Sequence, residues 1–183
     1  MKNKIVKRNS IFIAASIDGY IADKNGGIDW LNSIPNPDNI DMGYNDFISQ
    51  TDAIVMGRNT FETVCSFDID WPYQIPVFVL SNTMSMIPEA YQSKANLVRG
   101  TPENIIRSIH EMGYYRLYID GGKTIQSFLK EDLIDEMIIT TIPFLLGDGI
   151  RLFAGLRERL EFECVNSKLF LDKIVQNHFV RKR

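Results

Sequence analysis

Two glycine-containing segments, each placed where a strand should end and a helix begin, are the strongest chemical features of the sequence. The first follows the apolar run 53–56 (AIVM) and reads Gly57-Arg58-Asn59-Thr60. A glycine lets the backbone approach a ligand closely, and the N–H groups at a helix start attract an anion. Arg58 adds a forked donor suited to phosphate, and Thr60 adds a hydroxyl. The segment is typical of a phosphate-binding turn, with an ordinary helix start and a surface arginine as the alternative.

The second segment, 120–124 (DGGKT), follows the run 116–119 (RLYI). Two glycines between a strand and a helix again suit a pyrophosphate. The segment is not the GxGxxG fingerprint, and it is not a P-loop, because Leu117 stands where that motif requires its first glycine. This spacing excludes a kinase or NTPase of the P-loop type. A tight strand-to-helix connection is the alternative interpretation.

Two candidate phosphate-binding segments in one small protein together predict that it binds a dinucleotide. The pyrophosphate and the extra ribose phosphate of such a ligand need separate binding sites. Ser81 follows directly after the apolar run 77–80 (VFVL), and with Arg58 it is a candidate for binding a 2′-phosphate. That pairing favours NADPH over NADH.

The first apolar run, 10–17, contains small residues (Ala14-Ala15-Ser16) that can lie flat against a planar ring. Trp30, in the loop that follows, is a candidate for the wall of a pocket. Packing of Trp30 on the core is the alternative, because most tryptophans do this.

Alternation of strands and helices predicts the fold class. Strands are expected at 10–17, 53–56, 77–80, 96–98, 116–119 and 135–142, and a closing hairpin at 160–170 and 173–180. Helices are expected at 44–50, 58–64, 102–112 and 123–129, the third with Thr101 as its N-cap, and a loop at 31–43. This order indicates a three-layer α/β fold with a mostly parallel central sheet, helices on both faces and an antiparallel C-terminal hairpin. Ligands of such sheets bind at the carboxyl ends of the strands.

Length and charge limit the classes of function. The 183 residues indicate a single domain, 1–183, with 1–9 as a flexible N-terminus. A net charge of −3 gives no sign of a nucleic-acid or membrane partner. Cys65 and Cys164 form neither a disulfide framework nor a metal site, so no metal is expected. The absence of a secretory signal and of a membrane-spanning run predicts a cytoplasmic protein.

The order of these segments resembles the dihydrofolate-reductase-like superfamily. It resembles more closely the reductase domain at the C-terminus of the bifunctional riboflavin-biosynthesis deaminase-reductase and its stand-alone relatives. The resemblance spans about 10–180. It is carried by AASIDGYIA (14–22), IDWL (28–31), DAIVMGRNTFE (52–62), VLSN (79–82), LYIDGGKTIQSFL (117–129) and PFLLGDGIRLF (143–153).

The resemblance implies an NADPH-dependent reductase and a role for particular residues. One phosphate region of the cofactor would be held by Gly57, Arg58 and Thr60, with Ser81 at the 2′-phosphate. The pyrophosphate would be held by Gly121, Gly122, Lys123 and Thr124. Ala15, Ile21 and Trp30 would lie near the nicotinamide and the substrate.

Two departures from the family pattern concern the substrate. Folate-reducing members carry a carboxylate on the helix before the MGR segment, and Gly43 stands near that position here. The riboflavin-pathway substrate carries a ribose phosphate, yet no Lys or Arg occurs between Leu31 and Val55 to bind it. The zinc signature of the deaminase half is also absent from the sequence.

The sequence therefore predicts an oxidoreductase that transfers hydride from NADPH to a small pyrimidine- or pterin-like substrate, resembling 5-amino-6-(5-phosphoribosylamino)uracil reductase. Dihydrofolate reductase activity and a non-catalytic NADPH-binding or regulatory protein are the alternatives. The catalytic candidates are Asp29, Trp30 and Asp46. The proton would come from Asp29, from Asp46 or from water, with Asp29 ahead because it adjoins Trp30. A homodimer is expected because such relatives commonly pair and because the stretch Ile142 to Phe153 is apolar.

Overall fold

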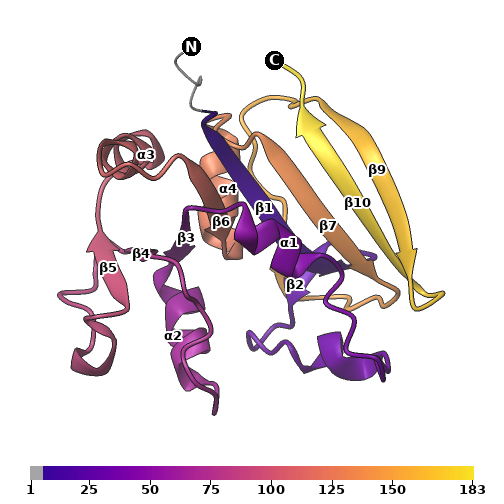
Figure 1. Ribbon diagram of the computed structural model, residues 1–183. Helices are drawn as coiled ribbons and strands as arrows, with labels where there is room; N and C mark the ends of the chain where they lie inside the picture. Colours follow the sequence, from indigo (N-terminus) through magenta and orange to yellow (C-terminus); the bar gives the residue numbers. More distant parts are fainter. Residues whose placement is uncertain (1–5) are drawn as a thin grey trace.

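The computed structural model describes residues 6–183, which form one large and one small sheet (Figure 1). The large sheet has eight strands in the order β5-β4-β3-β6-β1-β7-β10-β9. Its strands are β1 (Arg8–Ser16), β3 (Ala53–Gly57), β4 (Val77–Leu80), β5 (Ala95–Val98), β6 (Arg116–Asp120), β7 (Glu136–Ile142), β9 (Phe162–Phe170) and β10 (Ile174–Arg181). The first six in this spatial order are parallel, and β10 runs antiparallel to both β7 and β9. The small sheet pairs β2 (Tyr20–Ala22) with β8 (Ile150–Arg151).

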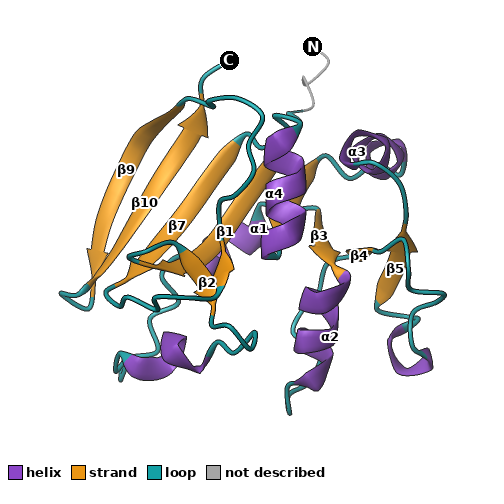
Figure 2. Cartoon of the chain, turned by 180° about the vertical axis from the view of Figure 1, so that it is seen from behind, coloured by secondary structure: helices purple, strands orange, loops and turns teal. Residues whose placement is uncertain are grey.

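Helices cover both faces of the large sheet, as Figures 1 and 2 show from opposite sides. The α-helices are α1 (Tyr44–Ser49), α2 (Arg58–Ser66), α3 (Pro102–Glu111) and α4 (Gly122–Lys130), and the 3-10 turns are η1 (Asp29–Ser33) and η2 (Glu89–Tyr91). Phe47 of α1 and Phe61 of α2 pack in one cluster with Ile54 and Met56 of β3. The alternate residues of β3 join a second cluster under α3 and α4. The predicted three-layer α/β fold with an antiparallel C-terminal hairpin is confirmed.

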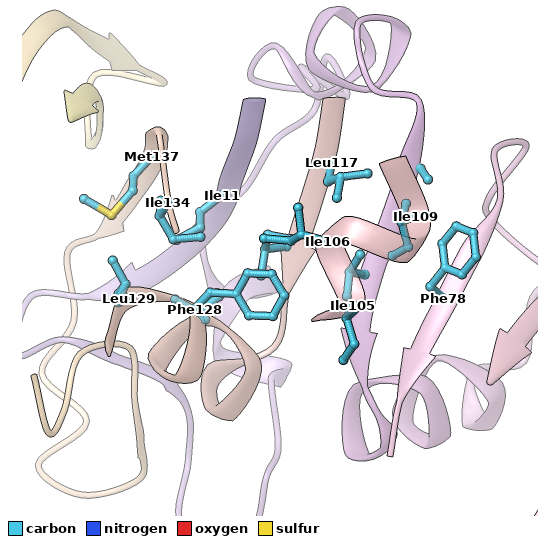
Figure 3. Close-up of a cluster of buried hydrophobic side chains, with 14 of the residues drawn as sticks. Ile11, Phe78, Ile105, Ile106, Ile109, Leu117, Phe128, Leu129, Ile134 and Met137 are labelled. Atoms are coloured by element: carbon cyan, nitrogen blue, oxygen red, sulfur yellow. The ribbon is translucent and has the colours of Figure 1, made fainter. Parts of the chain in front are cut away.

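The larger core lies between the sheet and the helices α3 and α4 (Figure 3). Ile105 and Ile109, one helical turn apart on α3, point at the sheet together with Phe128 of α4. The predicted start of α3 is confirmed, because the Thr101 side chain accepts a hydrogen bond from the backbone N–H of Asn104 at 3.4 Å. These packed helices hold the strand ends, and with them the candidate site, in fixed positions.

The structure corrects the expected N-terminus. β1 begins at Arg8, whose backbone N–H donates to the carbonyl of Tyr115 at 2.9 Å. The N–H of Asn9 donates to Asp135 Oδ2 at 2.7 Å. The prediction of a flexible segment over 1–9 is therefore wrong for Arg8 and Asn9, because their backbone N–H groups are hydrogen-bonded within the fold. Residues 1–5, also in that prediction, lie outside the described residues.

The small sheet was not predicted from the sequence. Its strands are only three and two residues long, and they pair across more than a hundred positions of sequence, with Tyr20 opposite Arg151. The expected loop at 31–43 begins inside the turn η1, which ends at Ser33. No helix within residues 6–183 is long and apolar enough to cross a bilayer.

Candidate functional site

The two glycine-containing segments lie side by side at the carboxyl edge of the sheet. β3 and β6 are parallel neighbours, with Met56 opposite Asp120 in the register. Both strands therefore end at the same level, and each leads directly into a helix: β3 into α2 and β6 into α4. The two helix starts predicted from separate stretches of sequence thus meet in one place.

Glycine is required in both segments because each backbone closely approaches a threonine side chain of the other segment. A Cβ at Gly57 would lie 2.7 Å from Thr124 Oγ1. A Cβ at Gly121 would overlap Thr60 Oγ1 and would lie 3.9 Å from the backbone nitrogen of Gly57. Gly121 also has a φ of 87°, which side-chain-bearing residues rarely adopt. Any larger residue at these two glycines would fill the space between the helix starts.

The N-termini of α2 and α4 carry no side-chain cap within the described chain, in contrast to α3. No acidic residue lies in the first turn of either helix. The helix dipole and the N–H groups of a first turn make a helix start attractive to an anion, and here two such starts converge, although the Gly121 N–H already donates to Asp120. This arrangement suits a pyrophosphate better than either helix start would alone.

Three further candidate residues for anion binding follow strand ends along the same edge of the sheet. Gly57 is opposite Leu80, and Leu80 is opposite Val98 in the parallel register. The residues that follow them, Arg58, Ser81 and Arg99, therefore come from three adjacent strand ends. In this spatial order the three strand ends are followed by an arginine, a serine and an arginine, residue types that suit a phosphate monoester.

These side chains already have partners in the protein. Arg58 Nε lies 2.7 Å from Glu62 Oε1, one turn along α2, and both side chains are largely exposed. The Ser81 hydroxyl accepts from the backbone N–H of Met84 at 3.0 Å, which fixes the turn after β4. Arg99 donates to the carbonyl of Met84 at 2.6 Å, so it belongs to the same turn.

The remaining predicted cofactor residues surround α4. Gly122 is buried, and a Cβ there would lie 2.9 Å from Cδ1 of Ile21, so β2 packs on the first turn of the helix. Thr124 is buried beneath this turn, whereas Lys123 is exposed. Ala15, at 4% exposure, faces the core under α3 and α4, while its neighbour Ala14 lines a cavity on the opposite face.

β6 ends in a carboxyl group that the sequence reasoning did not select. Asp120 accepts a hydrogen bond from the backbone N–H of Gly121 at 2.8 Å. The residue keeps some exposure, but its carboxyl group is enclosed, and this burial raises the pKa of Asp120 to about 6. A carboxyl group at a strand end with such a pKa exchanges a proton near neutral pH, which is a property of acid–base groups in enzymes.

Three tyrosines lie near enough to Asp120 for its charge to act on them. Burial, followed by the negative charge of Asp120, raises the pKa of Tyr44, Tyr73 and Tyr118, so all three hydroxyls stay protonated at neutral pH. The Tyr118 hydroxyl donates to the backbone carbonyl of Phe12 at 2.9 Å, and the Tyr44 ring packs edge-on against Phe12 with centroids 5.6 Å apart. Phe12 therefore separates this group of tyrosines from a neighbouring cavity.

That cavity, which we call the loop cavity, has a volume of about 390 Å³. It lies between the loop after η1 and the carboxyl ends of β1 and β7 with the adjoining start of β10. Its lining is formed by Phe12, Ala14, Leu31, Asn32, Ile34, Pro35, Asn36, Asp41, Met42, Thr140, Ile142 and Ile174. A mostly apolar cavity with a few polar groups at a strand edge is the usual form of a small-molecule site.

A second hollow, the hairpin groove, has a volume of about 430 Å³ and shares Phe12, Asp41 and Met42 with the loop cavity. It runs between α1 and the β9–β10 hairpin toward the beginnings of β1 and β7. Its charged and imidazole-bearing lining residues are Arg8, Asp41, Asp46, Glu136, Lys168 and His178. Buried Glu136 lies 3.3 Å from both Arg8 Nε and His178 Nε2, so these groups form a local ion-pair cluster.

The three catalytic candidates are not brought together. Asp29 is exposed in the first turn of η1 and lines neither hollow, so the fold does not enclose this carboxylate beside a ligand cavity. Asp46 is exposed and faces the hairpin groove rather than the loop cavity. Trp30 is half-buried, and its indole Nε1 is buried without a hydrogen-bond partner among the described residues.

Sequence reasoning missed Asp120 and Arg99. The signal for Asp120 was a carboxylate at the very end of a buried strand, directly before two glycines. The segment was interpreted only through its glycines. Arg99 had no local signal, because its place beside Ser81 follows from the pairing of β4 with β5.

The fold and its strand-edge site define a protein with a dihydrofolate-reductase-like architecture. A dihydrofolate reductase from Enterococcus faecalis, solved in complex with NADP(H), has this fold: it superimposes with a TM-score of 0.64 at 14% identity, over 96% of this chain and 97% of that one. Residues 10–176 match the RibD C-terminal domain. The chain belongs to the RibD C-terminal domain family, a reductase-like family, as the sequence resemblance indicated.

Two further solved structures are similar to this chain. A Shewanella sp. PV-4 protein, assigned provisionally to riboflavin biosynthesis, is 53% identical with a TM-score of 0.94, covering 96% of this chain and 99% of that chain. The diaminohydroxyphosphoribosylaminopyrimidine deaminase/5-amino-6-(5-phosphoribosylamino)uracil reductase of Thermotoga maritima gives 0.74 at 15% identity. The match covers 97% of this chain but only 57% of that longer chain.

Proposed function

We propose that this protein is an NADPH-dependent reductase of a small heterocyclic, pyrimidine- or pterin-like substrate. The observation that carries the proposal is the convergence of two uncapped helix starts, at Gly57 and Gly121, beside the enclosed carboxyl group of Asp120. Anion-binding backbone and a proton-exchanging group at one strand edge are what a hydride-transferring reductase needs from its protein.

The residues fit an NADPH molecule lying along the edge of the sheet. The backbones at Gly57, Gly121 and Gly122 would hold the pyrophosphate, since close approach there requires the absence of a Cβ. Thr60 and Thr124 would support it with their hydroxyls, and Lys123 with its charge. The 2′-phosphate would bind between Arg58 and Arg99 at Ser81, as inferred from the register of β3, β4 and β5.

The nicotinamide would then lie near the end of β1, where the small side chain of Ala14 lines the loop cavity. Bound NADPH supplies the hydride, and the protein orients the substrate and manages the proton. Ile21 and the backbone of Ala15 would limit the nicotinamide pocket. The indole N–H of the half-buried Trp30 is buried without a hydrogen-bond partner among the described residues, and Trp30 lines neither hollow.

Asp120 is the proton source that the geometry favours. With a pKa of about 6, a substantial fraction of its carboxyl groups is protonated just below neutral pH. Hydride addition to a C=N or C=O bond leaves a negative charge on nitrogen or oxygen. A proton from Asp120 would complete the reduction through water, because Asp120 lines neither hollow and Phe12 lies between it and the loop cavity. Solvent then restores the proton to Asp120.

Two alternatives predict different outcomes. Folate reduction usually relies on a carboxylate from the helix before β3, and the start of α1 is Gly43, which has no side chain. A non-catalytic NADPH-binding protein would have no use for an enclosed carboxyl group of raised pKa. Asp120 therefore favours an enzyme, with its acid in a different position.

The test is NADPH oxidation by the full chain, screened against pterins, pyrimidines and small carbonyl compounds. We expect substrate-dependent oxidation that falls about 100-fold or more in Asp120→Asn. Asp29→Asn, on the exposed turn η1, is the matched control and should leave turnover within about twofold. NADPH binding without oxidation of any substrate would support the non-catalytic alternative. Equal turnover in the Asp120 variant would remove Asp120 from the mechanism.

A further inference from the structure

We infer that the substrate enters the loop cavity without a phosphate or carboxylate group, as a neutral or cationic molecule; the inference rests on the proposed function, because it concerns the substrate of that site. Asp41 carries the one charged side chain in the lining, and no Lys or Arg from residues 6–183 contributes to it. Eight of the twelve lining residues are apolar. An anion transferred from water into such a cavity loses its hydration without gaining a cation.

The polar groups of the loop cavity do not compensate for this lack of a cation. Asn36 already bridges the backbone of Ile40, accepting from its N–H and donating to its carbonyl at 2.9 Å each. Thr140 Oγ1 accepts a hydrogen bond from Gln176 Nε2 at 3.0 Å. What remains for a ligand is the amide of Asn32 and the Thr140 hydroxyl proton, which suit a neutral heteroatom.

The charge that is present has the wrong sign for a phosphate. Asp41 Oδ1 and Oδ2 accept hydrogen bonds from the backbone N–H groups of Gly43 and Asn45, at 3.0 and 2.9 Å. These bonds lower the pKa of Asp41, so the group stays ionised across the neutral range. A fixed negative charge at the border of the cavity repels an anionic substrate and attracts a cationic one.

The cations of the hairpin groove are separated from the loop cavity. Arg8 and Lys168 line the hairpin groove, and Arg8 already faces Glu136 at 3.3 Å. Gln176 Nε2 donates to the Met42 carbonyl at 3.0 Å as well as to Thr140, and thereby ties the loop wall to β7 between the two hollows. A phosphate on a substrate in the loop cavity would have to pass Met42 to meet Lys168.

The experiment compares matched ligands that differ only in a phosphate. Ligand-observed NMR on the full chain, with and without NADP⁺, would use uridine with uridine 5′-phosphate, and 6-hydroxymethylpterin with its phosphate. We expect the unphosphorylated member of at least one pair to bind, and to bind at least about tenfold more tightly than its phosphate. Asp41→Asn, which removes the charge but keeps one of the two oxygens that accept from the backbone N–H groups, should reduce the preference for the unphosphorylated ligand.

Two further variants locate the effect. Ile34→Lys introduces a cation into the cavity lining and should shift the preference toward the phosphate. Lys168→Met, in the groove, should leave the preference unchanged. The inference is overturned if a phosphorylated ligand binds as tightly as its partner, if Lys168→Met abolishes such binding, or if none of the four ligands binds. NADPH affinity, measured separately by fluorescence titration, tests the proposed function. The proposed function and the inference about the substrate can therefore fail independently of each other.

Discussion

Burial raises the pKa of the Asp120 carboxyl group, and the local sequence does not indicate this change. Asp29 was predicted as the proton donor because it adjoins Trp30, but in the structure it is exposed on η1. Asp120, in contrast, is enclosed in the folded chain, where Tyr44 and Tyr73 from two other segments lie near it. A sequence states which residue ends a strand. The enclosure of its carboxyl group depends on side chains brought in by tertiary packing.

The raised pKa of Asp120 makes a prediction about stability that needs no substrate. The folded state holds this proton more tightly than the unfolded chain, whose pKa is near the ordinary value of 3.8. Wild-type stability should therefore fall as the pH rises from about 4 through about 6, relative to Asp120→Asn. We expect the variant to match wild type at pH ~4 and to gain up to ~3 kcal/mol at pH ~8.

Urea unfolding of both proteins across this pH range measures the difference. Asp46→Asn, a substitution on the exposed face of α1, controls for the general effect of removing a carboxylate. If Asp120→Asn is no more stable than wild type at high pH, then burial does not destabilise the ionised form of the Asp120 carboxyl group.

The second prediction concerns the adenosine end of the cofactor. Arg58→Ala and Arg99→Ala should each weaken NADPH binding by about 10- to 100-fold, because a charge-assisted phosphate contact contributes about 1.5–3 kcal/mol. NADH, which lacks the 2′-phosphate, should lose far less. Glu62→Gln, which releases Arg58 from its ion pair, should strengthen NADPH binding slightly.

Fluorescence titration with both cofactors checks this expectation. Arg107→Ala, an exposed arginine on α3, is the matched control. Equal losses for NADPH and NADH would show that Arg58 and Arg99 support the fold of the site without contacting the 2′-phosphate.

Among the helices and strands, those with local signals were predicted well. α2 and α4 begin within one residue of their predicted starts, since glycine after an apolar run marks such a junction. β2 and β8 were missed, because short strands that pair across distant sequence have no local periodicity. The cavity could not be predicted either, since its wall depends on the Gln176 bond that ties Met42 of the loop to β7.

The junction between α2 and α4 gives a third prediction. Gly113 and Gly121 both have a positive φ, of 94° and 87°, but a Cβ at Gly113 would meet nothing within 4 Å. Gly113→Ala should therefore lose only about 1 kcal/mol, from the backbone. Gly121→Ala should lose about 1–3 kcal/mol more, because its Cβ overlaps Thr60 Oγ1, and NADPH binding should disappear.

Thermal unfolding and NADPH titration of the two variants provide the comparison. Adding Thr60→Ala to Gly121→Ala should recover part of the lost stability by removing the overlapping hydroxyl. Similar behaviour of both single variants would mean that the helix starts are farther apart than the structure places them.

For the molecule as a whole, exposed apolar surface still favours a homodimer. β9 forms an edge of the large sheet, and its Val165 and Leu169 are 53% and 61% exposed. In the stretch Ile142 to Phe153, Leu145 is 72% exposed, although Ile142 itself is buried. Unprotected edge strands and apolar patches of this kind are usually covered by another chain.

We therefore expect a dimer in sedimentation experiments. Val165→Lys with Leu169→Lys should give monomers if β9 forms the interface, and Leu145→Lys should do so if the loop after β7 forms it. A wild-type protein that sediments as a monomer at high concentration would contradict the expectation.

The most direct test of the central claim is calorimetric titration of the full chain with NADPH. The account predicts one NADPH per chain with a Kd of about micromolar or tighter. It also predicts loss of that binding in Gly57→Val, whose side chain would occupy the space beside Thr124. No heat of binding with the folded wild-type chain, or undiminished binding by a folded Gly57→Val protein, would contradict the assignment of the two helix starts as the NADPH site.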